Sequence, residues 1–156
     1  MNGHRAEMET GGNLTKGLGY LAATVMSDVE AQNEKGETRL HRAVTRGAGD
    51  LRKAMLLLEH GADLEARDIN GETALLKAGR FHLPLTLALL EKGADIEARD
   101  NTGETVLHKA AMWCLPTTEA LIRLGANTSV KNTTGKTPLQ KAKEVGNVRH
   151  SLLSWI

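Results

Sequence analysis

The chain has 156 residues, of which 40% are hydrophobic and only 3% are aromatic. Leu and Ala must therefore supply most of the core, which favours closely packed helices over a β-sandwich or barrel rich in aromatic and β-branched residues. The 20 basic and 19 acidic residues leave a net charge of +1, and both signs are interspersed. The sequence has no basic stripe of the kind that would indicate a nucleic-acid or membrane-surface partner.

Residues 1–12 are polar and lack hydrophobic periodicity, so we expect a disordered tail there. The nearly uncharged run at 17–27 is shorter than the roughly 20 residues that span a bilayer. It resembles the apolar part of a signal peptide, but it leads directly into residues 28–33, which match residues 63–68. We therefore expect residues 13–35 to form a half-repeat cap, and the chain to be cytoplasmic. A secreted or periplasmic location is the alternative if the N-terminus is incomplete or replaced.

An eight-residue motif recurs four times, and its second and third copies read Gly-Glu-Thr-Ala-Leu-Leu-Lys-Ala and Gly-Glu-Thr-Val-Leu-His-Lys-Ala. The copies begin at Gly36, Gly71, Gly103 and Gly135, which are 35, 32 and 32 residues apart. A second motif, Leu-Leu-Glu-x-Gly-Ala-Asp, lies between them at 57–63 and 89–95, and returns in altered form at 121–127. Such self-similarity predicts stacked structural repeats.

The sequence of each repeat predicts two short helices and then a finger, which is the segment that joins the second helix to the first helix of the next repeat. A threonine precedes each first helix, at Thr38, Thr73, Thr105 and Thr137. Its hydroxyl can accept hydrogen bonds from the free backbone N–H groups of the first helical turn. The glycine of the second motif ends the second helix. The alternating residues that follow predict a small β-hairpin. One repeat cannot bury its leucine-rich face alone, so neighbours must stack.

These motifs resemble the ankyrin repeat, with its pattern G-x-T-P-L-H-x-A-A and later L-L-x-x-G-A-D. The resemblance covers residues 28–156, although only Thr137-Pro138 keeps the proline. It implies an all-α solenoid with short β-hairpin fingers, about four repeats and the N-terminal half-repeat cap in a single domain, 13–156. The repeats lie near 36–70, 71–102, 103–134 and 135–156, and residues 147–156 are expected to form the last second helix.

The residues that could carry chemistry have structural interpretations. His41 and His108 share one repeat position, where a metal or catalytic role competes with hydrogen bonds to the backbone of an adjacent repeat, as the resemblance implies. The pairs Glu65–Arg67 and Glu97–Arg99 are expected to form ion pairs between adjacent fingers rather than a recognition patch. The single cysteine excludes an internal disulfide and has no metal-ligand spacing. We predict no catalytic residue, metal or cofactor.

In proteins of this kind the concave face, made from finger tips and the last turns of the first helices, binds the partner. The candidate contacts at the helix ends are Arg46, Arg80, Phe81, Met112 and Trp113. Binding hot spots are enriched in Trp, Tyr and Arg, but the alternative is that Phe81 and Trp113 turn into the core. The finger residues Ile69, Glu37, Glu72 and Glu104 complete the predicted site. The three acids favour a partner with basic character, or they only solvate the surface.

The resemblance and the small size of the chain predict a non-catalytic protein that binds another protein as a monomer, with no nucleic acid or membrane. We expect an inhibitor, immunity or sequestering protein of an enzyme. The alternatives are a host-directed effector or a scaffold subunit and, from another class, a small ligand- or metal-binding protein or hydrolase.

Overall fold

The computed structural model describes residues 28–45 and 50–146, and in these ranges it contains seven helices and no strand. The helices are α2 (Arg39–Thr45), α3 (Leu51–Glu59), α4 (Ala74–Ala78), α5 (Leu83–Glu91), α6 (Val106–Trp113), α7 (Leu115–Arg123) and α8 (Pro138–Glu144). The expected tail at 1–12, the cap residues up to 27, loop residues 46–49 and the last helix at 147–156 lie outside the described residues.

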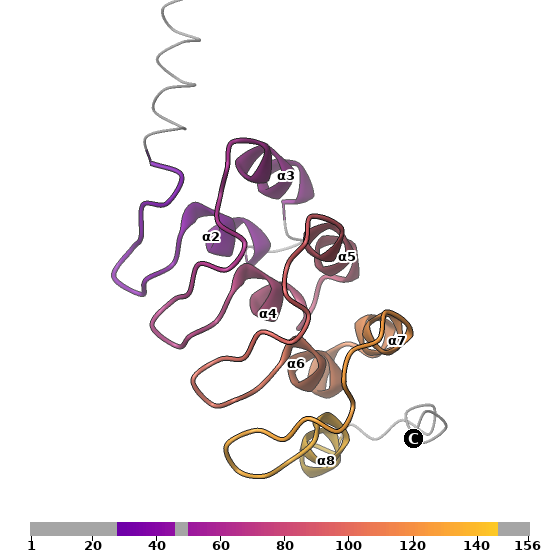
Figure 1. The fold of residues 1–156 in the computed structure, drawn as a ribbon. Helices are drawn as coiled ribbons and strands as arrows, with labels where there is room; N and C mark the ends of the chain where they lie inside the picture. Colours follow the sequence, from indigo (N-terminus) through magenta and orange to yellow (C-terminus); the bar gives the residue numbers. More distant parts are fainter. Residues whose placement is uncertain (1–27, 46–49, 147–156) are drawn as a thin grey trace, which may run out of the picture.

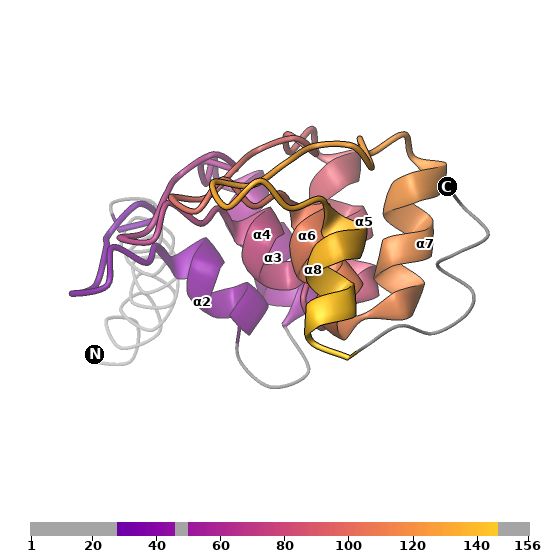
Figure 2. The ribbon, with the colours of Figure 1, turned by 90° about the horizontal axis from the view of Figure 1, so that it is seen from below.

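The helices form two stacked rows. The inner row contains α2, α4, α6 and α8, and the outer row contains α3, α5 and α7 (Figure 1). Each outer helix packs on the inner helix of its own repeat, and neighbouring repeats contact each other along both rows. The fingers extend to one side of the helices in the same order (Figure 2). The predicted all-α solenoid of stacked repeats is confirmed.

Threonine caps begin the inner helices, as expected. The Thr73 hydroxyl accepts from the backbone N–H of Leu76 at 3.4 Å, and Thr137 does the same for Gln140 at 3.4 Å. Thr105 forms a capping box with the histidine three residues later. Each such cap satisfies an amide that has no partner within its own helix, and is typically worth about 1 kcal/mol.

Leucine and alanine fill the space between the rows. The deeply buried leucines, at most 3% exposed, are Leu40, Leu75 and Leu107 on the inner helices and Leu57, Leu89 and Leu121 on the outer ones. Burying one such side chain contributes about 1.5–3 kcal/mol. Ala78 and Ala110, both fully buried, let neighbouring helices approach closely. This arrangement explains why so few aromatic residues are needed.

The fingers are turns, so the expectation of β-hairpins is wrong. In the second finger, Asp68 Oδ1 accepts from the backbone N–H groups of Asn70 and Glu72, both at 2.9 Å. The N–H of Asp68 donates to the Glu72 carbonyl at 3.1 Å. A single backbone bond, from Asn101 to Asn70 at 2.9 Å, joins this finger to the next. The Asp68 carboxylate thus accepts hydrogen bonds from backbone N–H groups that would pair with backbone carbonyls in a ladder of strands.

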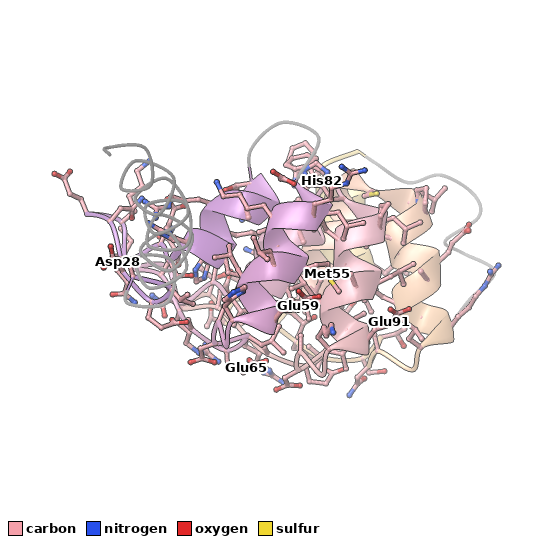
Figure 3. The ribbon with its side chains drawn as sticks, turned by 90° about the horizontal axis from the view of Figure 1, so that it is seen from above. Asp28, Met55, Glu59, Glu65, His82 and Glu91 are labelled. Carbon is pink, nitrogen blue, oxygen red and sulfur yellow. The ribbon has the colours of Figure 1, made fainter. Side chains whose placement is uncertain are left out.

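The outer helices form the face opposite the groove described below. Charged side chains such as Glu59 and Glu91 lie on this face, and His82 lies at the end of α5 opposite Glu91 (Figure 3). Glu65 lies near the finger edge of the same view. No helix in the described part of the chain is long and apolar enough to cross a membrane.

Candidate functional site

The fingers and the inner helices enclose a polar groove of about 600 Å³, which we call the concave groove. Residues from four successive repeats line it, including Glu37 of the first and Lys141 of the last. Its floor is formed by charged side chains of the inner helices and by acids at the base of the fingers.

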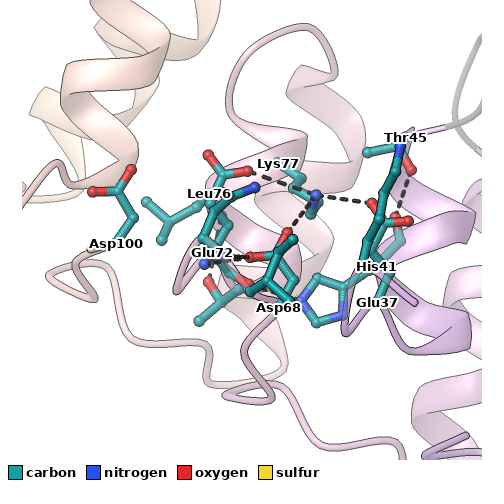
Figure 4. Close-up of polar contacts among 12 residues, drawn as sticks. Glu37, His41, Thr45, Asp68, Glu72, Leu76, Lys77 and Asp100 are labelled. Carbon is teal, nitrogen blue, oxygen red and sulfur yellow. Dashed lines mark hydrogen bonds and ion pairs between the residues drawn. The ribbon is translucent and has the colours of Figure 1, made fainter. Parts of the chain in front are cut away.

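Lys77 joins two repeats at this floor. Its Nζ lies 3.0 Å from Glu37 of the preceding repeat, and 2.8 Å from Asp68 and 3.6 Å from Glu72 in the finger that leads into α4. Figure 4 shows the ammonium group between the carboxylates of Glu37 and Asp68. Only 7% of the Lys77 side chain is exposed. The lysine therefore neutralises buried acids while linking neighbouring repeats.

Lys109 repeats this arrangement one unit further on. Its Nζ lies 3.3 Å from Glu72 of the preceding repeat, 2.5 Å from Asp100 and 3.0 Å from Glu104. Arg80 also pairs with Glu72 at 2.5 Å. The lysines and acids thus form a continuous ion-pair ladder along the groove.

The ladder holds its groups in their charged forms. Burial opposes ionisation of Asp100, but hydrogen bonds from Lys109 and Thr102 keep the pKa of this carboxyl below its ordinary value of 3.8. Burial likewise opposes the charge of Lys109, yet hydrogen bonds to Asp100 and Glu104 raise the pKa of its ammonium above 10.5. The favourable contacts outweigh the loss of hydration in both cases.

The acids predicted as an exposed line do not form one. Glu72 and Glu104 are each only 4% exposed, and Glu37 is half-buried. The interpretation of these two acids as solvating charges is wrong, because Lys77 and Lys109 take up their carboxylates. Sequence reasoning missed both lysines. The available signal was a basic residue at the same position of every repeat, at Arg42, Lys77, Lys109 and Lys141.

Phe81 and Trp113 lie on the surface at the ends of their inner-helix segments. They are 63% and 55% exposed, their ring centroids are 6.4 Å apart, and the rings are tilted by 45°. The alternative that these rings fold into the core is therefore wrong. Both following loops are short, because α5 and α7 begin directly after His82 and Cys114 with a proline in the first turn.

The other predicted contacts have different surroundings. Ile69 is 63% exposed at a finger tip, whereas Met112 is only 8% exposed and belongs to the interior. Arg80 is partly buried and its guanidinium contacts Glu72. Arg46 lies outside the described residues. The structure thus places the Phe81–Trp113 pair and Ile69 at the surface and removes Met112 from the accessible set.

The paired histidines hold the repeats together. His41 Nε2 lies 2.9 Å from the backbone carbonyl oxygen of Glu72, and His108 Nε2 lies 3.1 Å from that of Lys136. Both carbonyls belong to the next repeat, so the interpretation as backbone contacts between repeats is confirmed. Within the described ranges no group of three His, Cys, Asp or Glu side chains is placed to hold a metal ion.

Adjacent fingers are also linked at their outer side, but not by the expected ion pairs. Glu65 accepts from the backbone N–H of Asp95 at 2.9 Å, and Glu97 accepts from that of Asn127 at 2.8 Å. Arg67 donates to the Arg99 carbonyl oxygen at 2.5 Å. The expectation of ion pairs is wrong, because the backbone of the next repeat offers these side chains fixed partners.

Comparisons with known proteins agree with this architecture. A family model described as ankyrin repeats, in three copies, matches residues 11–100, which is more than half of the chain. A segment of 38 residues is 58% identical to part of the potassium channel AKT3 of Oryza sativa subsp. japonica. This segment is 24% of the present chain and only 4% of the channel. With its stacked helix pairs, fingers and repeat motifs, the chain belongs to the ankyrin-repeat family of protein–protein interaction modules.

Proposed function

We propose that this ankyrin-repeat chain is a non-catalytic inhibitor, immunity or sequestering protein that holds one partner protein against its concave face. The free chain is a monomer located in the cytoplasm. Such a role needs a surface that excludes water on contact, and a fold that exists before the partner arrives. The Phe81–Trp113 pair is the observation that carries this proposal.

The two rings are half of the four aromatic residues in the chain, and both are more than half exposed. The core is built from Leu and Ala, so these rings contribute little to packing. Exposed aromatic side chains are costly to hydrate, and they dominate the energetics of interfaces. Their equivalent positions in adjacent repeats place them side by side, which makes one anchor patch out of two residues.

The test is a double variant, Phe81→Ala with Trp113→Ala, used as bait for partners in a lysate of the source cells, with bound proteins identified by mass spectrometry. The matched control is Leu56→Ala with Leu124→Ala. Leu56 lies on α3 and is 48% exposed, and Leu124 lies at the end of α7 and is 56% exposed. We expect the aromatic variant to lose the partner while its Tm stays within a few degrees, and the leucine variant to keep the partner.

The purified partner, once identified, allows the inhibitor role to be measured. Titration of the chain into the partner should reduce the partner's activity or its binding to its own target in a one-to-one ratio. Retention of the partner by the folded aromatic variant would show that the anchor lies elsewhere.

A further inference from the structure

The last described repeat interrupts the ion-pair ladder. In the two preceding fingers, an aspartate and a glutamate contact the lysine of the inner helix that follows, as Asp100 and Glu104 contact Lys109. In the finger that leads into α8, Asn132 and Lys136 stand at these two positions. Lys141, the counterpart of Lys109, therefore has no carboxylate from its own finger.

This substitution leaves Lys141 less neutralised than the other ladder lysines. Among the described residues it pairs with Glu104 alone, at 2.7 Å, and Glu104 is already shared with Lys109. The Lys141 side chain is 30% exposed, compared with 7% for Lys77 and Lys109. Lys141 also lines the concave groove. An accessible cation thus stands where the ladder lacks its acids.

The net charge of the described residues also changes from negative to positive toward the C-terminal repeats. The described residues up to 104 contain 15 acidic and 10 basic side chains, a net charge of −5. Residues 105–146 contain 2 acidic and 6 basic side chains, a net charge of +4. Both signs occur throughout the chain, but the repeats at its C-terminal end attract negative charge.

We infer that Lys141 receives an acidic side chain of the partner protein, which supplies the ion pair that Asp100 supplies to Lys109. This inference rests on the proposed function and specifies the partner. Its contacting segment carries an aspartate or glutamate for Lys141, together with an apolar side chain for the Phe81–Trp113 pair on the neighbouring repeats. The buried acids Glu72 and Glu104 are already paired, so they do not select a basic partner.

The chain offers a nearly isosteric variant for the test. Asn132 Oδ1 accepts from the backbone N–H groups of Thr134 and Lys136, both at 3.0 Å, as Asp68 and Asp100 do in their own fingers. Asn132→Asp therefore keeps the turn. It replaces the Nδ2 group that donates to Glu104 Oε1 at 3.4 Å with a second carboxylate oxygen, beside the acid that Lys141 contacts. Lys141→Gln removes the cation, and Lys141→Arg keeps it.

The probe is a phage-displayed library of random peptides, selected in parallel on the wild-type chain and on Asn132→Asp. We expect acidic residues to be enriched on the wild-type chain and not on the variant. The most enriched peptide is then synthesised with a twin in which Glu and Asp are replaced by Gln and Asn. In about 0.15 M salt the twin should bind the wild-type chain about tenfold more weakly.

The remaining arms separate this inference from the proposed function. Lys141→Arg should keep the preference for the acidic peptide, while Asn132→Asp and Lys141→Gln should lose it. Peptides that require Phe81 and Trp113 but carry no excess of acid overturn the inference and leave the proposed function standing. Failure to enrich any peptide on the folded wild-type chain counts against both.

Discussion

The Nε2 atom of His41 lies 2.9 Å from the backbone carbonyl oxygen of Glu72 in the next repeat. The Nδ1 atom of the same ring accepts from the backbone N–H of Thr38 at 3.2 Å. Because a backbone N–H can only donate and a carbonyl can only accept, the neutral ring carries its proton on Nε2. The imidazole thus caps its own helix and binds the following finger, and His108 does the same one repeat before the last.

Replacement of both His41 and His108 by Gln should lower the free energy of unfolding by about 2–3 kcal/mol, since each loses one buried bond worth about 1–1.5 kcal/mol. Gln140 stands naturally at this position and its Oε1 accepts from the Thr137 N–H at 2.9 Å, so the cap itself survives. Urea unfolding followed by circular dichroism measures the change. His82→Gln, at a position without a side-chain cap, is the control and should stay within about 0.5 kcal/mol.

Acid should destabilise the protein already as the pH falls below 6.5, through His108. Burial lowers the pKa of this imidazole below its ordinary value of 6.5. The unfolded chain therefore takes up a proton first as the pH falls, and folding loses stability below pH 6.5 and keeps it fully above. Urea midpoints measured from about pH 5 to 8 should fall toward acid, and His108→Gln should flatten this part of the curve. An unchanged slope in the variant would assign the effect to other groups.

A second loss of stability should begin below pH 4.5, through the acids of the ion-pair ladder. The pKa values of Asp100 and Glu104 lie below their ordinary values of 3.8 and 4.5, because hydrogen bonds from lysines outweigh the effect of burial. The unfolded carboxylates thus bind protons before the folded ones do, and stability present above pH 4.5 disappears as the pH falls. Added salt should weaken this step only slightly, since the pairs are buried.

Lys109→Met should destabilise the chain by about 3–5 kcal/mol, because it leaves the buried Asp100 carboxylate without its cation and removes one of the two cations that contact Glu104. Asp100 and Glu104 are each at least 92% buried, and among the described residues Lys109 is the only cation that contacts both. Lys141→Met is the matched control. Its side chain is 30% exposed and contacts a single acid, so we expect a loss of about 1 kcal/mol or less. Equal losses in the two variants, measured by urea unfolding, would contradict the importance of burial.

The repeat architecture could be predicted from local signals, because each is carried by neighbouring residues. Thr73 caps the helix that begins at the next residue, and Gly93 ends an outer helix with a φ of +95° that few other residues adopt. The burial of Glu72 depends instead on Lys109, 37 residues later, and is set by stacking. The direction of Phe81 could not be predicted, because a large aromatic ring serves in a core as well as at a contact surface; in the structure its side chain is 63% exposed.

The contact between fingers predicts a difference between two glycines of equivalent position. Gly71 and Gly135 have φ values of +71° and +76°, so alanine costs about 1–2 kcal/mol of backbone strain at either. At Gly71 the added Cβ would also lie 2.3 Å from Asn101 Oδ1 and 2.9 Å from its backbone nitrogen, whereas at Gly135 it would meet nothing within 4 Å. Displacing Asn101 breaks its two hydrogen bonds to Ile69 and Asn70. Gly71→Ala should therefore lose about 2 kcal/mol more than Gly135→Ala in urea unfolding, and equal losses would show that the fingers do not stabilise one another.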